Sequence, residues 1–215
     1  MAFYPVCLDV LNERCVVVGG GEVAERKAAG LLECGAKVAL VARDLTTTLR
    51  AMRDAGEIEQ IPDDYREEYL EGAFLVIGAT DREDVNEQIS RDARDRGIPV
   101  NIVDVPARCT FIVPSVFRRG DLLVAVSTGG KSPALARRVR EEIEERYGPE
   151  YGTLLTIMGA LRERIIARGA PSAENRVLFE AVLDSAILRY IREGKGDRVR
   201  EIIRDLTGED IDVGF

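Results

Sequence analysis

The stretch Cys15-Val-Val-Val-Gly-Gly-Gly-Glu-Val-Ala24 decides the fold of this 215-residue chain. It begins as a short apolar β-branched strand and continues as a helix, with Gly19, Gly21 and Ala24 in the spacing G-x-G-x-x-A. In this context the first glycine makes a tight turn, the second lets a pyrophosphate approach the backbone, and the alanine lets helix and strand pack closely. The phosphate would lie on the free N–H groups of the helix N-terminus. The stretch predicts dinucleotide binding, and an ordinary strand-to-helix turn is the alternative.

The sequence on both sides of this stretch alternates short apolar strands with helices. We expect strands over 15–18, 37–42, 58–61, 74–77 and 100–103, and helices over 22–34, 45–55 and 83–96. Nearly continuous apolar strands that alternate with helices are typical of a parallel sheet covered on both faces. With right-handed crossovers this is a Rossmann-type, doubly wound α/β domain, which we assign to residues 1–112.

The pattern changes after residue 104. Strands over 111–113 and 122–126, joined by a turn over 118–121, precede a helix that has Ser132 as N-cap, Pro133 at its first position and an end near Tyr147. Residues 113–147 are too few to hold a core alone, so we expect a small α/β dimerisation segment that packs against a second copy. Residues 148–215 form a C-terminal helical domain, with helices over about 151–168, 172–192 and 197–206.

Composition limits the chemistry that the chain can perform. The chain has no histidine, which excludes Ser-His-Asp and Cys-His nucleophiles, His-ligated zinc and histidine general acid–base catalysis. Its four cysteines lack CxxC spacing, so we expect reduced thiols and no bound metal. The net charge of −8 disfavours nucleic acid as a partner. Without a basic leader or an apolar run of about 18 residues, we expect a cytoplasmic protein that does not enter a membrane.

The residues after the second and fourth strands bear on the choice of cofactor. Asp44 follows Ala24 by 20 residues, where a carboxylate can accept hydrogen bonds from ribose hydroxyls. Arg43 beside it could hold a 2′-phosphate, which the carboxylate repels, so we favour NAD over NADP. Thr80, at the end of the fourth strand, is a further candidate for cofactor contact. A helix N-cap formed by Thr80 or Asp81 is an equally good interpretation.

Asp104 follows the fifth strand, at the edge where open α/β sheets bind their ligands. In a chain without histidine, this carboxylate is the leading candidate for a proton-transfer group. A carboxylate that caps the turn before Pro106 is the alternative.

A basic segment extends from Arg108 to Arg140, where seven Arg and Lys residues and one Asp give a net charge of +6. Arginine offers bidentate hydrogen bonds, so the segment suits a ligand with several carboxylates. Alternatively, the helical arginines pair with glutamates of the same helix. The loop Ser127-Thr-Gly-Gly-Lys-Ser-Pro133 places hydroxyls and Lys131 at a helix N-terminus. It lacks the P-loop spacing, so a carboxylate fits these donors better than ATP does.

Six blocks of the sequence match a known family in order and spacing. They are Tyr4-Pro-Val, Val18-Gly-Gly-Gly-Glu-Val-Ala-Glu-Arg-Lys27, Ala79-Thr-Asp81, Val100-Asn-Ile-Val-Asp104, Phe111-Ile-Val-Pro-Ser115 and Val124-Ala-Val-Ser-Thr-Gly-Gly-Lys-Ser-Pro-Ala-Leu-Ala-Arg137. They resemble the precorrin-2 dehydrogenase / sirohydrochlorin ferrochelatase family, which is also the N-terminal module of siroheme synthase. The resemblance covers about residues 3–145, whereas the helical tail fits the family in length and character only.

The resemblance implies an NAD-dependent oxidoreductase that converts precorrin-2 to sirohydrochlorin in siroheme synthesis, as a homodimer built through the middle segment. Some members also insert iron as sirohydrochlorin ferrochelatase. The family's essential aspartate falls on Asp104, and a serine of its S-S-G-G loop falls on Thr128. Its nucleotide contacts fall on Glu22, Val23, Arg43 and Asp44.

The expected mechanism combines these parts. NAD takes a hydride from the tetrapyrrole macrocycle, and Asp104 removes the accompanying proton. The carboxylates of the tetrapyrrole are expected to be bound by Arg108, Ser127, Thr128, Lys131 and Arg137. Two other function classes stay open: a dehydrogenase of another polycarboxylate, and a non-enzymatic NAD-sensing domain that needs neither Asp104 nor the basic segment.

Overall fold

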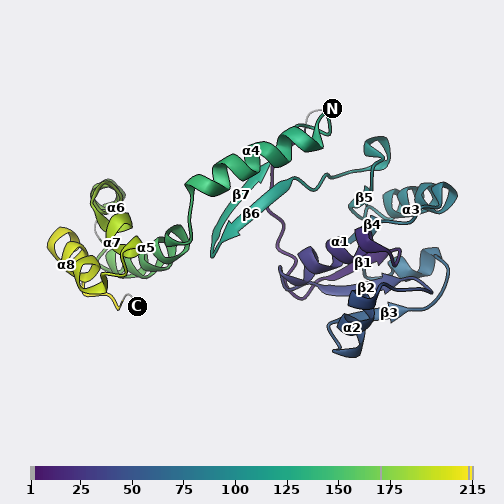
Figure 1. Cartoon of the computed structure of the whole chain (residues 1–215), viewed down its shortest axis with the longest axis horizontal. Coiled ribbons are helices and arrows are strands. Elements are labelled where there is room, and N and C mark those ends of the chain that lie inside the picture. Colours follow the sequence, from purple (N-terminus) through teal and green to yellow (C-terminus); the bar gives the residue numbers. More distant parts are fainter. Residues whose placement is uncertain (1–2, 170, 213, 215) are drawn as a thin grey trace. The chain divides into compact units, whose positions relative to one another are not determined.

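The computed structural model describes residues 3–169, 171–212 and 214, and Figure 1 shows the elements along the chain. The chain divides into two compact units, Met1–Val113 and Pro114–Phe215. The further division of the second unit into a dimerisation segment and a helical domain stays a prediction.

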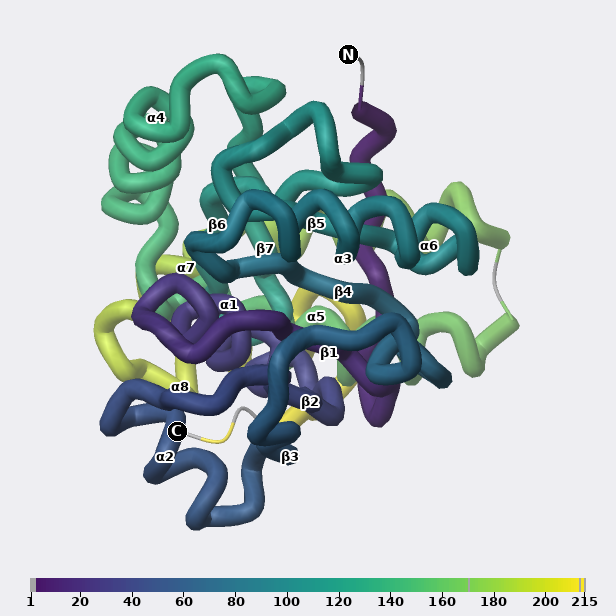
Figure 2. The backbone as a smooth tube through the Cα atoms, turned by 90° about the vertical axis from the view of Figure 1, so that its right-hand side faces the viewer, coloured from purple at the N-terminus to yellow at the C-terminus, as the bar shows by residue number. Residues whose placement is uncertain are grey.

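The first unit is a parallel five-stranded sheet. Its strand order is β3-β2-β1-β4-β5, and the strand labels in Figure 2 follow this order from the bottom of the view to the top. The strands are β1 (Arg14–Val18), β2 (Lys37–Val41), β3 (Ile58–Ile61), β4 (Leu75–Gly78) and β5 (Val100–Ile102). All four pairings are parallel, and the order is that of a doubly wound dinucleotide-binding sheet, so the predicted fold class is confirmed.

Helices cover both faces of this sheet. They are α1 (Glu22–Leu32), α2 (Thr47–Asp54) and α3 (Glu83–Asp95), with 3₁₀ turns at Glu67–Leu70 and Pro106–Arg108. Because successive residues of a strand point to opposite faces, Cys15 and Val17 pack in the core beneath α1 and α2, whereas Val16 and Val18 pack beneath α3 with Ile89. Burial of each such valine stabilises the fold by roughly 1.5–3 kcal/mol.

The strand order places the candidate site. The chain runs from β1 to β2 on one side and returns to β4 on the other, so the carboxyl ends of β1 and β4 border the crevice where such sheets bind ligands. The glycine loop follows β1, Thr80 follows β4 and Asp104 follows β5.

The second unit begins with an antiparallel pair, β6 (Ser115–Arg119) and β7 (Leu122–Val126), against which α4 (Pro133–Arg146) packs. Ser132 caps α4 as predicted, because its side chain accepts a hydrogen bond from the backbone N–H of Leu135 at 3.2 Å. The predicted strand over 111–113 is wrong. Phe111 instead packs on the core of the first unit, and its carbonyl oxygen accepts a hydrogen bond from Asn101 Nδ2 at 3.1 Å.

Four helices complete the second unit: α5 (Glu150–Ala167), α6 (Ser172–Asp184), α7 (Ile187–Arg192) and α8 (Gly196–Thr207). They enclose a core of their own that includes Leu161, Ile187 and Ile203. The predicted continuous helix over 172–192 is interrupted at Ser185, whose hydroxyl donates to the carbonyl oxygen of Val182 and accepts from the N–H of Ile187. No helix in the described ranges is long and apolar enough to cross a membrane.

Candidate functional site

The glycine loop connects β1 to α1 through very close backbone contacts. Gly19 has a φ of +128°, and a Cβ there would lie 2.4 Å from the carbonyl oxygen of Ala79. A Cβ on Gly20 would lie 1.8 Å from the carbonyl oxygen of Asp44, and the N–H of Thr46 donates to the Gly20 carbonyl oxygen at 3.0 Å. The loops after β1, β2 and β4 are therefore fixed together. Gly20 was not predicted as a site residue. The sequence did contain a signal, because its run of three glycines has one glycine more than the motif needs.

Gly21 faces open space, in contrast to its two neighbours. It occupies the N-cap position of α1 with a φ of −88°, and a Cβ built there would meet no atom within 4 Å. No side chain that the structure describes caps α1, so the first N–H groups of the helix, beginning with those of Glu22 and Val23, are left for a ligand or solvent. This arrangement fits a phosphate, because an uncapped helix N-terminus is a ready anion site.

A cavity of about 270 Å³ opens at this edge of the sheet. Four of the predicted cofactor residues line it, namely Gly19, Arg43, Asp44 and Thr80. Residues that were not predicted also line it: Gly20, Asp63, Asp64, Tyr65, Arg82 and Val85. Gly21, Glu22 and Val23 are not among its lining residues. The cavity thus joins the loops that follow the first four strands.

Carboxylates lie around Arg43, the residue that could favour NADP over NAD by binding a 2′-phosphate. Arg43 Nη2 lies 2.9 Å from Asp64 Oδ2 and 3.8 Å from Asp63 Oδ1. A hydrogen bond from Tyr69 is the main reason that the pKa of Asp63 is lowered, so this carboxylate stays ionised. Asp44 is exposed and adds a third negative charge. The cavity therefore disfavours a second phosphate next to the ribose.

Thr80 shapes the loop after β4. Its Oγ1 accepts a hydrogen bond from the N–H of Arg82 at 3.1 Å, and its carbonyl oxygen accepts one from Asn86 Nδ2 at 2.8 Å. The N-cap residue of α3 is Arg82, so the alternative in which Thr80 or Asp81 is the N-cap is wrong. Thr80 holds a turn at the wall of the cavity.

Asp104 stands in a tight turn after β5 in the left-handed conformation, with a φ of +60°. The N–H of Val105 donates to the carbonyl oxygen of Ile102 at 3.2 Å, which makes Asp104 the third residue of a four-residue turn. Among residues with a Cβ, Asn and Asp tolerate this conformation best. The carboxylate is exposed, and it forms no hydrogen bond or ion pair with any residue that the structure describes. The capping interaction considered as the alternative is not formed.

Lys27 of α1 shares the surroundings of Asp104. Burial is the main reason that the pKa of Lys27 is lowered, and Arg26 acts in the same direction, while Asp104 and Cys109 oppose the shift. The half-buried ammonium is thus close enough to Asp104 to interact with its charge. Lys27 was not predicted as a site residue, although it ends the glycine-loop block.

Five of the six arginines of the basic segment, all except Arg118, are shown paired with glutamates. Arg108 of the first unit lies 3.3 Å from Glu87 and 3.4 Å from Glu83. In α4, Arg137 binds Glu141 at 2.8 Å, and Arg138 and Arg140 each bind a glutamate one turn further on. The alternative of pairing within the helix is therefore present. The Arg137 and Arg138 pairs are exposed to solvent, where ion pairs are weak, so a ligand carboxylate can replace the glutamate there.

The loop before α4 is closed by its own hydroxyls. Ser127 Oγ accepts a hydrogen bond from the N–H of Gly129 at 3.1 Å. Thr128 Oγ1 accepts from the N–H of Ser132 and donates to its carbonyl oxygen, at 3.1 and 3.0 Å. Lys131 is exposed. Binding of substrate by this loop stays a prediction.

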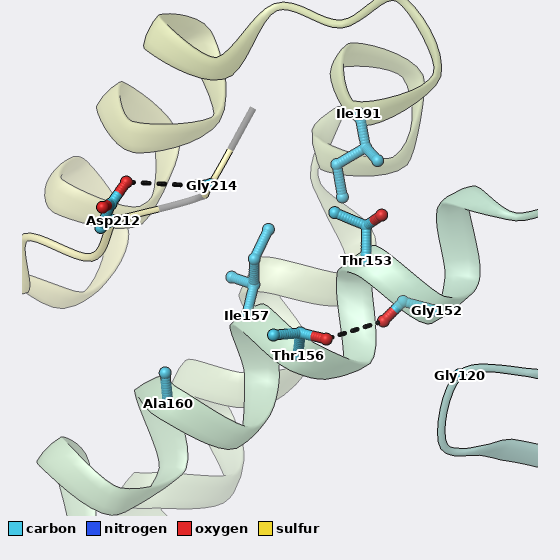
Figure 3. Close-up of a pocket in the computed structure, with 9 residues that line it drawn as sticks. All are labelled: Gly120, Gly152, Thr153, Thr156, Ile157, Ala160, Ile191, Asp212 and Gly214. Carbon is cyan, nitrogen blue, oxygen red and sulfur yellow. Dashed lines mark hydrogen bonds between the residues drawn. The ribbon is translucent and has the colours of Figure 1, made fainter.

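A larger cavity, of about 620 Å³, lies along α5 in the second unit (Figure 3). Its lining is mostly small or apolar: Gly120, Gly152, Thr153, Thr156, Ile157, Ala160, Ile191, Asp212 and Gly214. Thr156 Oγ1 donates to the carbonyl oxygen of Gly152 at 3.2 Å. No residue predicted for the site belongs to this lining.

In the part of the chain that the structure describes, no group of three or more Cys, Asp and Glu side chains is placed to hold a metal ion.

Three family models match consecutive segments of the chain. Residues 6–115 match a family described as "Putative NAD(P)-binding". Residues 119–146 match the sirohaem biosynthesis protein central region, and residues 150–206 match the sirohaem synthase dimerisation region.

Individual proteins show the same similarity. The siroheme synthase of Methylobacillus flagellatus is 38% identical over 96% of this chain and 44% of its own length. That of Photorhabdus laumondii is 36% identical over 97% of this chain and 46% of its own length, so the chain spans less than half of these relatives. A solved structure of SirC, a precorrin-2 dehydrogenase, has the same fold, with a TM-score of 0.77 and 24% identity over 96% of this chain and all of its own.

Proposed function

The chain belongs to the family of sirohaem biosynthesis proteins with an NAD(P)-binding domain, and on that premise we propose that it oxidises precorrin-2 to sirohydrochlorin with NAD. One observation carries the proposal. The Asp104 carboxylate, which forms no hydrogen bond or ion pair with any described residue, stands two strands from the glycine loop on the ligand-binding edge of the same sheet. The siroheme synthases that the chain resembles in sequence, and the precorrin-2 dehydrogenase that it resembles in fold, support the proposal.

Different residues of the chain bind the cofactor, accept the proton and bind the substrate. When bound, NAD supplies the hydride acceptor. The uncapped N-terminus of α1 binds the pyrophosphate, and Asp44 binds the ribose hydroxyls. Asp104 accepts the proton that leaves the macrocycle together with the hydride, so that the substrate loses two hydrogens. Arg108, Ser127, Thr128, Lys131 and Arg137 bind the substrate carboxylates, by exchange with the glutamates or loop groups that they now contact.

An anaerobic assay with enzymically generated precorrin-2 and no added metal tests the proposal. NADH and sirohydrochlorin should form in equal amounts, followed by their absorption spectra. Binding of NAD without turnover of precorrin-2 would instead support the NAD-sensing interpretation. Turnover of a different polycarboxylate but not of precorrin-2 would show that the protein is a dehydrogenase with another substrate.

Replacement of Asp44 by alanine should weaken NAD binding and reduce the preference for NAD over NADP. The lost hydrogen bonds involve a charged acceptor, so the Kd for NAD should rise roughly 10- to 100-fold. The matched control is Asp54→Ala, an exposed carboxylate of α2 outside the cavity, which should leave both affinities unchanged. Titration of both cofactors decides, and tighter binding of NADP than of NAD by the parent protein would contradict the assignment.

We propose a homodimer formed through the second unit. On the two-stranded sheet, Phe117 is 5% exposed on the face under α4, whereas Val116 on the opposite face is 45% exposed. In a single chain the apolar side chain of Val116 stays in contact with water, so a second copy is the expected cover for this face.

Sedimentation at low micromolar concentration should therefore give about twice the 23.7 kDa of one chain. The variant Val116→Asp should shift the population towards monomer, because it places a charge in the interface. A parent protein that sediments as a stable monomer would refute the dimer.

A cytoplasmic location fits the cysteines. Cys7, Cys15 and Cys109 are free thiols, and burial raises the pKa of Cys15 to about 11, so this thiol is protonated at neutral pH. Unpaired cysteines are typical of a reducing compartment. We therefore propose that the enzyme works in the cytoplasm.

A further inference from the structure

Cys109 contacts both ends of the turn that carries Asp104. Its Sγ accepts a hydrogen bond from the N–H of Ile102 at 3.2 Å. The same sulfur lies 3.2 Å from the carbonyl oxygen of Ile102 and 3.3 Å from that of Val105, to which its S–H can donate. Ile102 and Val105 are the first and last residues of the turn, so one thiol contacts the backbone groups that define it.

The cysteine itself is held firmly. It is 9% exposed and belongs to the core cluster beneath α3. Asn101 Nδ2 lies 3.6 Å from the sulfur, and Arg94 Nη2 donates to the Cys109 carbonyl oxygen at 3.2 Å. Ser90 of α3 donates to the neighbouring carbonyl oxygen of Arg108 at 2.7 Å. The thiol therefore ties the turn to β5, and the backbone at Cys109 and Arg108 is bound to α3.

The protonation state of the thiol suits this role. Burial is the main reason that the pKa of Cys109 is raised, whereas the hydrogen bond with Ile102 acts in the opposite direction. The sulfur thus keeps its proton at neutral pH, and a protonated thiol is both a donor and an acceptor. The turn offers it one N–H group and two carbonyl oxygens.

The turn needs such support because its third residue is strained. A left-handed conformation is unfavourable for a residue with a Cβ and persists only where the surrounding structure imposes it. The Asp104 carboxylate forms no bond of its own among the residues described that would hold the turn. We propose that Cys109 is a positioning residue, whose thiol fixes the Asp104 turn so that the carboxylate meets the substrate in one orientation. The inference rests on the proposed role of Asp104 as proton acceptor.

Kinetics of three cysteine variants test this inference in the full-length protein. Cys109→Ala should lower kcat roughly 10- to 100-fold, the effect of a misplacement of about 1 Å, with the Kd for NAD unchanged. Cys109→Ser should recover most of the loss, because a hydroxyl is also donor and acceptor. The matched control is Cys15→Ala, fully buried in the core on the other face of the sheet, which should lower Tm and keep kcat. Parental kcat in Cys109→Ala would overturn the inference.

A double variant separates this inference from the proposed function. If Cys109 acts through Asp104, adding Cys109→Ala to Asp104→Asn should cause no further loss of kcat. Losses that multiply in the double variant would show that the thiol acts elsewhere and overturn the inference. Parental turnover in Asp104→Asn alone would instead refute Asp104 as the proton acceptor.

Hydrogen exchange gives a readout that needs no substrate. The amide of Val105, which donates within the turn, should exchange faster in Cys109→Ala than in the parent, and Cys15→Ala should leave its rate unchanged. Equal exchange at Val105 in the parent and in Cys109→Ala would overturn the inference whatever the reaction proves to be.

Discussion

Asp104→Asn should lower the turnover number by roughly 10²- to 10⁴-fold, the usual contribution of a positioned general base, with little change in NAD affinity. Asparagine keeps the size of the side chain and tolerates the left-handed conformation, so the turn at φ +60° should survive the change. What is lost is the ability to accept a proton. Turnover and thermal melting measured on one sample check this prediction.

Asp104→Gly completes the test. Glycine removes the carboxylate and also the strain of the positive φ, so its Tm should equal or exceed that of the parent while turnover is lost. Asp121→Asn, an exposed carboxyl in the β6–β7 turn, serves as control and should leave turnover intact. Near-parental turnover with a lowered Tm in Asp104→Asn would show that the carboxylate only stabilises its turn.

Gly21→Asp should abolish NAD binding in a protein that remains folded. Nothing lies within 4 Å of a Cβ at this position, and aspartate is a good N-cap residue, so stability should change by only a few tenths of a kcal/mol. The same carboxylate would occupy the place of the pyrophosphate and repel it. Calorimetric titration with NAD and thermal melting give the two results.

Variants of two other glycines are compared with Gly21→Asp. Gly30→Asp places the same charge in open space further along α1 and should retain NAD binding. Gly20→Ala should instead prevent correct folding, because its Cβ would lie 1.8 Å from a backbone oxygen. Unchanged NAD affinity in folded Gly21→Asp would move the nucleotide away from the glycine loop.

The sequence was most informative where one residue pattern has one structural outcome. Strands β1, β2 and β4 are mostly apolar because both faces of the sheet are covered. The strand over 58–61 was predicted with its observed bounds. The apolar run at 111–113 has the same pattern but forms no strand. Its Phe111 packs instead against the core of the first unit. The break at Ser185 depends on one side-chain hydroxyl and has no periodic signal.

The site was predictable only in part for a related reason. Motif spacing identified Gly19, Arg43 and Asp44, which do line one cavity. Asp63 and Asp64 reach the same cavity because β3 pairs with β2, a contact between distant segments that local patterns do not specify. Cys109 likewise meets Asp104 only once the chain has turned back upon β5.

The tight contacts of the glycine loop fix its conformation before the cofactor binds. The loop is anchored to the ends of β2 and β4 through backbone groups, including the hydrogen bond from Thr46 to Gly20. The conformational entropy of this segment is therefore lost when the domain folds, before any nucleotide arrives. A preorganised site needs no ordering step at the moment of encounter, so NAD affinity reflects direct contacts with little reduction from reorganisation of the protein.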